Sequence, residues 1–89
     1  MISVVIGTYN QKETLKMVLV SLMNQSIPLE EYEIIVVDSS STDGTAEMAG
    51  EFKVKYIRVE NKGKSAARNK GIAEAKGEII LLTDADMIA

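Results

Sequence analysis

The chain has 89 residues, 46% of them hydrophobic and 26% charged, a composition typical of one soluble globular domain or of part of a larger one. It contains no cysteine and no histidine, which excludes a disulfide framework and the usual zinc ligands and leaves oxygen donors that suit Mg²⁺ or Mn²⁺. The net charge is −3, but eight of the ten basic residues lie between Lys53 and Lys76, which favours a small anionic ligand over a nucleic acid.

The first predicted elements are a strand and a helix. Residues 2–6 are apolar but too short to span a membrane, and no basic stretch precedes them, so we expect no signal peptide. The expected location is cytoplasmic, with the cytoplasmic face of the membrane as an alternative for a longer protein. Asn10 is expected to cap the helix, with Glu13 three residues on. The helix carries one apolar stripe, formed by Leu15, Val18, Leu19, Leu22 and Met23.

The middle of the chain is predicted to form a strand, a short helix and another strand. Residues 33–37 form the second strand, and a helix starts near Thr42 or Asp43, whose side-chain oxygens can cap its free amides. Asp43 and Gly44 are interpreted as turn and cap residues. The third strand is expected at residues 54–59. The apolar side of the short helix is expected to consist of Ala46, Met48 or Ala49, and Phe52.

The last predicted elements are a third helix and a fourth strand. The helix runs from about Lys64 to Lys76, its small side chains allow close approach to the sheet, and Gly77 is expected to end it in the left-handed conformation. Residues 78–83 form the fourth strand. The first, second and fourth strands are nearly continuous in Ile, Val and Leu, which predicts coverage on both faces. The fold class is therefore α/β: a Rossmann-like, three-layer α/β/α domain with three helices and a mostly parallel sheet of about four strands.

The spatial order of the strands that fits short, right-handed connections is 3-2-1-4. In that order the direction of growth reverses between the first and fourth strands, and ligands of open α/β sheets bind beyond the carboxyl ends at such a point. Polar residues follow three of these ends, at residues 7–10, 38–44 and 83–86. The sequence therefore predicts that three loops meet at one rim and bind the ligand there.

Two acids follow the fourth strand, Asp84 and Asp86. Side chains two residues apart in an extended chain point the same way, so both carboxylates can bind one hard cation. Such an ion could neutralise charge on a leaving phosphate. The alternative is that the strand ends in solvated acids, one of which caps a following helix.

Three further residues are candidates for ligand contacts. Tyr9 could stack on a nucleobase or pack at the edge of the core, and the two explanations weigh equally. Asp38 could accept from a base or a ribose, or it could satisfy turn amides. Arg68 is the preferred phosphate contact in the basic stretch, ahead of Lys62 and Lys64, and this stretch does not have the spacing of a Walker loop.

Taken in order, these segments resemble the amino-terminal part of a family 2 glycosyltransferase with the GT-A fold. The resemblance covers all 89 residues and depends on the order of five pieces, each weak alone. The pieces are residues 3–10 (SVVIGTYN), 22–26 (LMNQS), 33–45 (EIIVVDSSSTDGT), 61–63 with 67–69 (NKG and ARN), and 84–86 (DAD), which matches the D-x-D motif of the family.

The resemblance implies sugar transfer from a UDP-, GDP- or dTDP-sugar with Mg²⁺ or Mn²⁺. Thr8 and Tyr9 match the loop that holds the base, and Asp38 matches the acid after the second strand. Arg68 matches the basic residue near the nucleotide. The D-x-D acids match the metal and ribose-diphosphate contacts, with Asp84 on both and Asp86 as the main metal ligand. Two residues depart from the family: Gly7 stands where proline is usual, and Ser39 stands where many members have a second acid.

By the same resemblance, residues 1–89 are the nucleotide-binding half of a truncated GT-A domain. The acceptor half and the general base of inverting members are absent, so no catalytic residue is assigned, the acceptor is unknown and we expect no turnover from this chain alone. One alternative is a phosphatase with Asp84 as nucleophile, although its acid pair would follow the first strand. A flavodoxin-like binding domain would need a fifth strand. The remaining alternative is a non-catalytic scaffold that self-associates through its exposed sheet edges.

Overall fold

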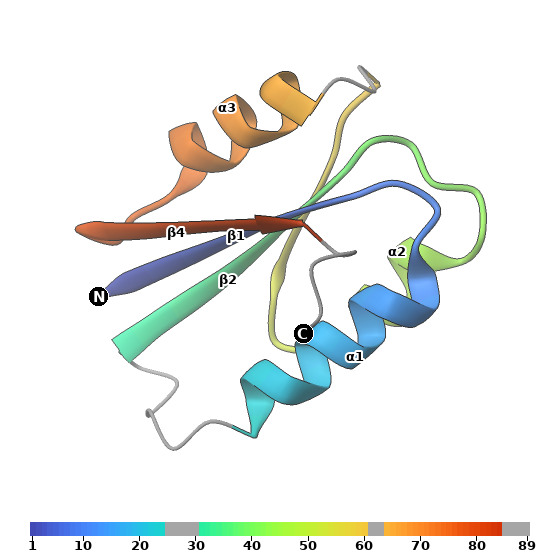
Figure 1. Ribbon diagram of the computed structural model, residues 1–89, viewed down its shortest axis with the longest axis horizontal. Coiled ribbons are helices and arrows are strands. Elements are labelled where there is room, and N and C mark those ends of the chain that lie inside the picture. The colour runs from blue at the N-terminus through green and yellow to red at the C-terminus, as the bar shows by residue number, and fades with distance from the viewer. Residues whose placement is uncertain (25–30, 61–63, 85–89) are drawn as a thin grey trace.

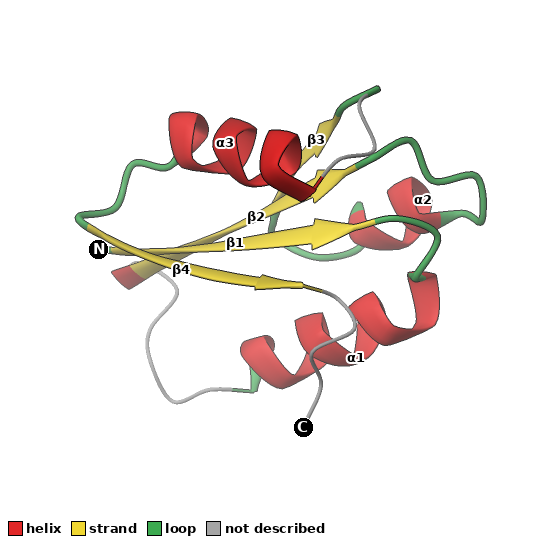
Figure 2. Cartoon of the chain, turned by 45° about the horizontal axis from the view of Figure 1, so that its top comes forward, coloured by secondary structure: helices red, strands yellow, loops and turns green. Residues whose placement is uncertain are grey.

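The fold is a four-stranded parallel sheet with helices on both faces, seen in a computed structural model that describes residues 1–24, 31–60 and 64–84. The strands lie in the order β3-β2-β1-β4, and all three neighbouring pairs are parallel, which confirms the predicted topology. Figure 2 shows their arrowheads pointing the same way. Along the chain the elements are β1 (Ile2–Thr8), α1 (Lys12–Met23), β2 (Tyr32–Asp38), α2 (Thr45–Ala49), β3 (Lys55–Arg58), α3 (Lys64–Glu74) and β4 (Ile79–Asp84).

The helices form two separate outer layers. In Figure 1, α3 lies on one face of the sheet, and α1 and α2 lie on the other. Alternate side chains of β1 and β2 supply a core on each face, because successive residues of a strand point to opposite sides. The core under α1 and α2 is built from Val4, Ile6, Leu15, Leu19, Ile34, Val36 and Met48. The core under α3 is built from Val5, Ile35, Val37 and Ala67. The predicted three-layer arrangement is confirmed.

Helix α1 buries the predicted stripe, but the prediction of its cap is wrong. Leu15 and Leu19 are fully buried, and the other stripe residues pack partly buried against the same core. The N-cap residue is Gln11, which makes no side-chain capping bond. Asn10 instead adopts a left-handed φ of 49°, and its Oδ1 accepts a hydrogen bond from the amide of Thr42 at 2.8 Å. Its side chain is therefore directed to another loop and not to the helix.

Helix α2 begins at Thr45, later than predicted. Gly44 is its N-cap residue with a left-handed φ of 90°, and the carboxylate of Asp43 accepts from the amide and the hydroxyl of Thr45. The interpretation of Asp43 and Gly44 as turn and cap residues is thus confirmed. Of the residues predicted for its apolar side, Met48 and Ala49 are both buried, whereas Ala46 and Phe52 are only half-buried.

Helix α3 ends at Glu74, two residues before the predicted end. The amide of Lys76 donates to Glu33 Oε2 at 2.6 Å, so it is not used to extend the helix. The left-handed cap at Gly77 is also wrong, because Gly44 is the only described glycine with a positive φ. Gly77 is required for a different reason: a Cβ there would lie 2.6 Å from Ser3 Oγ and 2.7 Å from the Met1 carbonyl oxygen.

Strand β4 differs from the prediction that it is covered on both faces. That prediction holds for β1 and β2, whose residues form the core, but Ile79, Ile80, Leu81 and Leu82 are 56%, 37%, 52% and 45% exposed. The reason is position: β4 is an edge strand that pairs only with β1 among the described elements. The two edges of the sheet are β3 and β4, as the predicted strand order 3-2-1-4 requires. No helix in the described ranges is long and apolar enough to cross a bilayer.

Candidate functional site

The carboxyl ends of three neighbouring strands meet at one rim of the sheet. In the strand register, Thr8 of β1 is opposite Asp38 of β2, and Gly7 is opposite Asp84 of β4. Asp38 is in turn opposite Arg58 at the end of β3. The backbone thus places the two predicted acidic positions on either side of the β1 end, at the edge where open α/β sheets bind ligands.

The carboxylate of Asp38 accepts three hydrogen bonds at this rim. Its side chain is 0% exposed, and Oδ1 accepts from the Ser41 amide at 3.0 Å and from the Ser41 hydroxyl. Oδ2 accepts from the Tyr56 hydroxyl and lies 4.0 Å from Arg58 Nη1, which also donates to the Ser41 carbonyl at 3.1 Å. A carboxylate has about four lone-pair sites, and here three receive hydrogen bonds while a cation lies near the fourth.

The surroundings of Asp38 also change the pKa of Tyr56. Burial, together with the hydrogen bond that it donates to Asp38, raises the pKa of Tyr56 to about 12. The nearby Arg58 opposes this shift because a cation stabilises the phenolate. The phenol therefore stays protonated near neutral pH and remains a donor to the buried carboxylate.

The loops after β1 and β2 are held together by hydrogen bonds in both directions. The Asn10 amide donates to Ser41 Oγ at 2.7 Å, and the Thr42 amide donates to Asn10 Oδ1 at 2.8 Å. The Lys12 amide donates to Asp43 Oδ2 at 3.1 Å. Nearer the sheet, the amide of Ser39 donates to the Thr8 carbonyl at 3.0 Å, so the two loops leave the sheet as a pair.

Thr8 and Tyr9, the two predicted contacts on the β1 loop, face different surroundings. Tyr9 is 41% exposed. Thr8 is only 5% exposed, and its Oγ1 has no hydrogen-bond partner among the described residues. A buried hydroxyl without a partner is unusual because desolvation of a polar atom costs free energy.

The basic stretch is only partly described. Arg68 lies on the exposed side of α3, whereas Lys62 and the side chain of Lys64 lie outside the described residues. Lys55 and Lys70 bind Glu74, with N–O distances of 2.8 and 3.8 Å, so part of the positive charge is neutralised locally. Helix α3 begins at Lys64, a few residues after β3 ends, and its first turn therefore lies on the carboxyl side of the sheet (Figure 1).

Of the two predicted metal ligands, the structure describes only the backbone of Asp84. Asp84 is the last residue of β4, and its side chain and all of Asp86 lie outside the part of the chain that the structure describes. Among the side chains that are described, no group of three or more acids gathers to bind a metal ion. The assignment of Asp84 and Asp86 to a cation stays a prediction.

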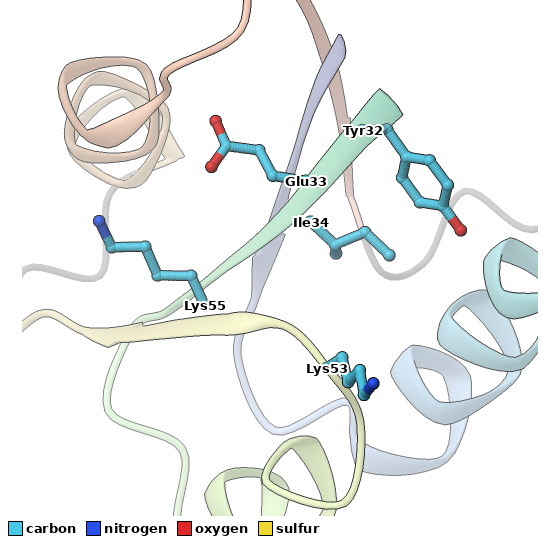
Figure 3. A pocket seen from close by; sticks show the side chains of 5 residues that line it. All are labelled: Tyr32, Glu33, Ile34, Lys53 and Lys55. Carbon is cyan, nitrogen blue, oxygen red and sulfur yellow. The ribbon is translucent and has the colours of Figure 1, made fainter. Parts of the chain in front are cut away.

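A cavity of about 250 Å³ lies at the opposite end of the sheet (Figure 3). It is lined by Tyr32, Glu33, Ile34, Lys53 and Lys55, which belong to the starts of β2 and β3 and the loop before β3. Lys55 and Glu33 are also engaged elsewhere, with Glu74 and with Ser3. Since ligands of parallel sheets bind at the carboxyl ends, this cavity is not the candidate site.

Three residues at the rim were not predicted as site residues from the sequence: Ser41, Tyr56 and Arg58. Ser41 is one of three consecutive serines, and nothing in the sequence distinguishes it from its neighbours. Arg58 of β3 is opposite Asp38 in the strand register, and Tyr56, two residues earlier, is opposite Val36 and reaches Asp38 through its hydroxyl. Their alternation, which places both on one face, was the only available signal.

The fold and its rim define an α/β domain of the GT-A type, with polar residues at the carboxyl edge of its sheet. The sequence model of glycosyl transferase family 2 matches residues 3–89, and the chain belongs to this family. The poly(ribitol-phosphate) beta-glucosyltransferase of Bacillus spizizenii is 42% identical over 96% of the chain and 14% of that protein. The glycosyltransferase AglE of Haloferax volcanii is 38% identical over 96% of the chain and 30% of that protein.

Solved structures show the same architecture. TarS 1-349 of S. aureus, in complex with UDP, matches with a TM-score of 0.89 and 33% identity over 96% of the chain and 27% of that structure. The mannosyltransferase PcManGT of Pyrobaculum calidifontis, in complex with GDP-Man and Mn²⁺, matches with a TM-score of 0.83 and 33% identity over 96% and 27%. The chain therefore spans less than a third of the length of each of these relatives.

Proposed function

We propose that the protein binds a nucleotide-diphosphate sugar at its carboxyl rim, with a divalent cation, as part of a glycosyltransferase. The observation that carries this proposal is the register that sets Asp38 and Asp84 on either side of the end of β1. Membership of glycosyl transferase family 2 supports it, as do the complexes of two structural neighbours with UDP and with GDP-Man. The donor is a UDP-, GDP- or dTDP-sugar in this proposal.

The nucleotide contacts that we propose are Thr8, Tyr9, Arg68 and Asp84. The exposed ring of Tyr9 can stack on a base, an interaction worth roughly 1 to 3 kcal/mol in nucleic-acid binders. The unpartnered hydroxyl of Thr8 lies next to it in sequence. Arg68 offers a planar cation for phosphate oxygens. Asp38 belongs to the same rim through the loop that it anchors.

The proposed cation is Mg²⁺ or Mn²⁺, held by Asp86 and Asp84. Both ligands are carboxylates, and the chain has no cysteine or histidine to attract zinc, so the donor set fits a hard cation. When bound, such an ion neutralises the negative charge that develops on a departing diphosphate. A structural neighbour contains Mn²⁺ together with GDP-Man.

We also propose that the 89 residues alone bind the donor without transferring the sugar. Transfer requires a bound acceptor and a group that takes its proton, and none of the described residues is assigned to either task. The chain covers only 14% and 30% of two curated relatives, which supports this division. Turnover of a nucleotide sugar by the purified chain would contradict it.

Calorimetric titration with UDP, GDP and dTDP, with and without Mn²⁺, tests the proposal. We expect metal-dependent binding that Asp86→Ala weakens by at least about tenfold, the loss that even outer partners of metal ligands cause. Glu31→Ala is the matched control, because it removes an exposed carboxylate next to the start of β2, at the other end of the sheet. Absence of nucleotide binding, or equal weakening by both variants, would refute the proposal. A phosphorylated Asp84 would favour the phosphatase alternative.

The exposed edge strand favours a second proposal, that two copies of this chain pair through β4. Four consecutive apolar residues of β4 are exposed, two on each face, and its outer edge has no partner strand among the described elements. A two-fold axis would join two such edges into one continuous sheet. Sedimentation equilibrium should show a dimer that Leu81→Lys dissociates and that Met17→Lys, an exposed position on α1, does not. A monomer at all concentrations would contradict this pairing.

A further inference from the structure

The oxygens of Asp38 are already occupied by groups of the protein. It is fully buried, two of its hydrogen bonds come from Ser41, a third comes from Tyr56, and Arg58 lies beside it. Because this carboxylate is fully buried, a base or ribose could reach it only if Ser41, Tyr56 or Arg58 moved. Any influence of Asp38 on a ligand is therefore transmitted through the residues that it holds.

Ser41 is the residue through which this influence can pass. It is buried, and it has one hydroxyl proton, which it donates to Asp38. Toward the Asn10 amide its Oγ can then act only as an acceptor, at 2.7 Å. The chain of bonds thus has a fixed direction, from the Asn10 amide through the Ser41 hydroxyl to the Asp38 carboxylate. Such a chain is strengthened by the charge at its end.

Asn10, which lies at the other end of this series of hydrogen bonds, directly follows Tyr9 in the sequence. Asn10 has a left-handed φ of 49°, a conformation that a non-glycine residue adopts only when its surroundings hold it. The bond from its amide to Ser41 and the bond from the Thr42 amide to its side chain supply that support. The backbone turn at Asn10 sets the direction in which the preceding residue, Tyr9, leaves the rim.

We propose that Ser41 is a positioning residue for nucleotide binding: it fixes the Tyr9–Asn10 loop to the buried Asp38 carboxylate, and Asp38 acts through it without touching the ligand. This inference rests on the proposed function, because it concerns how the same rim is prepared for a nucleoside. It adds to that function a residue that makes no ligand contact itself. A rim fixed before binding loses less conformational entropy when the ligand arrives.

Amide hydrogen exchange tests the connection directly in the 89-residue chain. In Ser41→Ala we expect the Asn10 and Thr42 amides to exchange at least about tenfold faster, because one hydrogen bond of ordinary strength is lost. Amides in the centre of β1 and β2 should keep their protection. Ser40→Ala is the matched control: it also removes a loop hydroxyl, but that hydroxyl donates to the Val59 carbonyl at 2.7 Å and not to the Asn10 side.

Nucleotide titration with Mn²⁺ tests the functional part. Ser41→Ala should weaken binding about tenfold while Ser40→Ala does not, and Ser41→Thr, which keeps the hydroxyl, should restore much of the loss. In the Ser41→Ala background, Asp38→Asn should cost no further affinity, because the hydroxyl bond is already lost and the asparagine Oδ1 can still accept the amide of residue 41.

The possible failures can be told apart. Absence of nucleotide binding to the unaltered chain would refute the proposed function and the ligand part of this inference together. Unchanged exchange at Asn10 in Ser41→Ala would refute the connection. With binding intact, a full additional loss from Asp38→Asn in the Ser41→Ala background would show that Asp38 touches the ligand and would overturn the inference.

Discussion

Replacing Gly71 with alanine is expected to destabilise the protein, although alanine is the better helix former by about 1 kcal/mol. The added Cβ would lie 2.2 Å from Val5 Cγ1 and 3.2 Å from Val37 Cγ2. Both valines are buried in the two central strands of the sheet, Val5 at 2% and Val37 at 0% exposure. Overpacking costs about 1 to 3 kcal/mol, and an overlap this short belongs at the upper end. The expected net loss in the free energy of unfolding is therefore about 2 kcal/mol.

Urea denaturation followed by circular dichroism measures this loss. Asn69→Ala is the control, since it also introduces an alanine into α3 but at an exposed position, where the gain in helix propensity is unopposed and stability should be equal or higher. Val5→Ala removes the methyl group that the new Cβ would strike, so the double variant should lose less than the sum of the single losses. A Gly71→Ala chain as stable as the parent, or strict additivity, would refute the explanation by close helix-to-sheet packing.

Two further predictions concern pH. Burial and the hydrogen bond to Asp38 raise the pKa of Tyr56 to about 12 in the folded state. The phenol therefore loses its proton less readily in the folded than in the unfolded chain. The contribution of Tyr56 to stability is complete below pH 10 and is lost as the pH rises through about 12. An ultraviolet titration should lose this late component in Tyr56→Phe, and its persistence would contradict the assignment. The Ser3 hydroxyl, and then the Lys76 and Gly77 amides, lower the pKa of Glu33 below its ordinary 4.5, so its contribution to stability is present above pH 4.5 and lost as the pH falls through the lowered pKa. Thermal unfolding should therefore depend less on acidic pH in Glu33→Gln than in the parent, and equal slopes would contradict this.

The elements that follow from local sequence pattern were predictable. The stripe of α1 depends on residues three and four positions apart, and the strand order depends on short connections between clear apolar runs. The meeting of the β1, β2 and β4 ends at one rim follows from that order alone. The backbone positions of Asp38 and Asp84 could therefore be predicted from the sequence, because Asp38 directly follows the apolar run of one strand and Asp84 follows the run of another after a single threonine.

The contacts that could not be predicted from the sequence join residues far apart in the chain. Asn10 has the composition and spacing of a helix cap, but its partner Thr42 lies 32 residues away and holds it in another conformation. The end of α3 depends on Glu33, 43 residues from Lys76. In each case the local preference was real, and a non-local hydrogen bond outweighed it.

The exposure of strand β4 could not be predicted from the sequence for a different reason. A continuous run of Ile and Leu indicates an environment with apolar neighbours on both faces, but it does not say which polypeptide supplies them. Here the four side chains from Ile79 to Leu82 are exposed in the described part of the chain. The run therefore predicted the strand correctly and its burial incorrectly.

The buried Asp38 carboxylate connects stability with function. A buried charge is expensive, and even a well-paired one often stabilises a fold less than apolar residues of the same volume would. Its presence here makes sense if the geometry that it imposes on the loops is useful. The two kinds of variant should then separate: Gly77→Ala, which crowds Ser3 and Met1 at the other end of the sheet, lowers the free energy of unfolding and leaves nucleotide affinity intact in the folded fraction, because the loop bonds lie at the opposite end. Ser41→Ala lowers affinity by more than its effect on stability explains. If affinity instead followed stability across both variants, the rim would be an ordinary part of the fold and not a preorganised site.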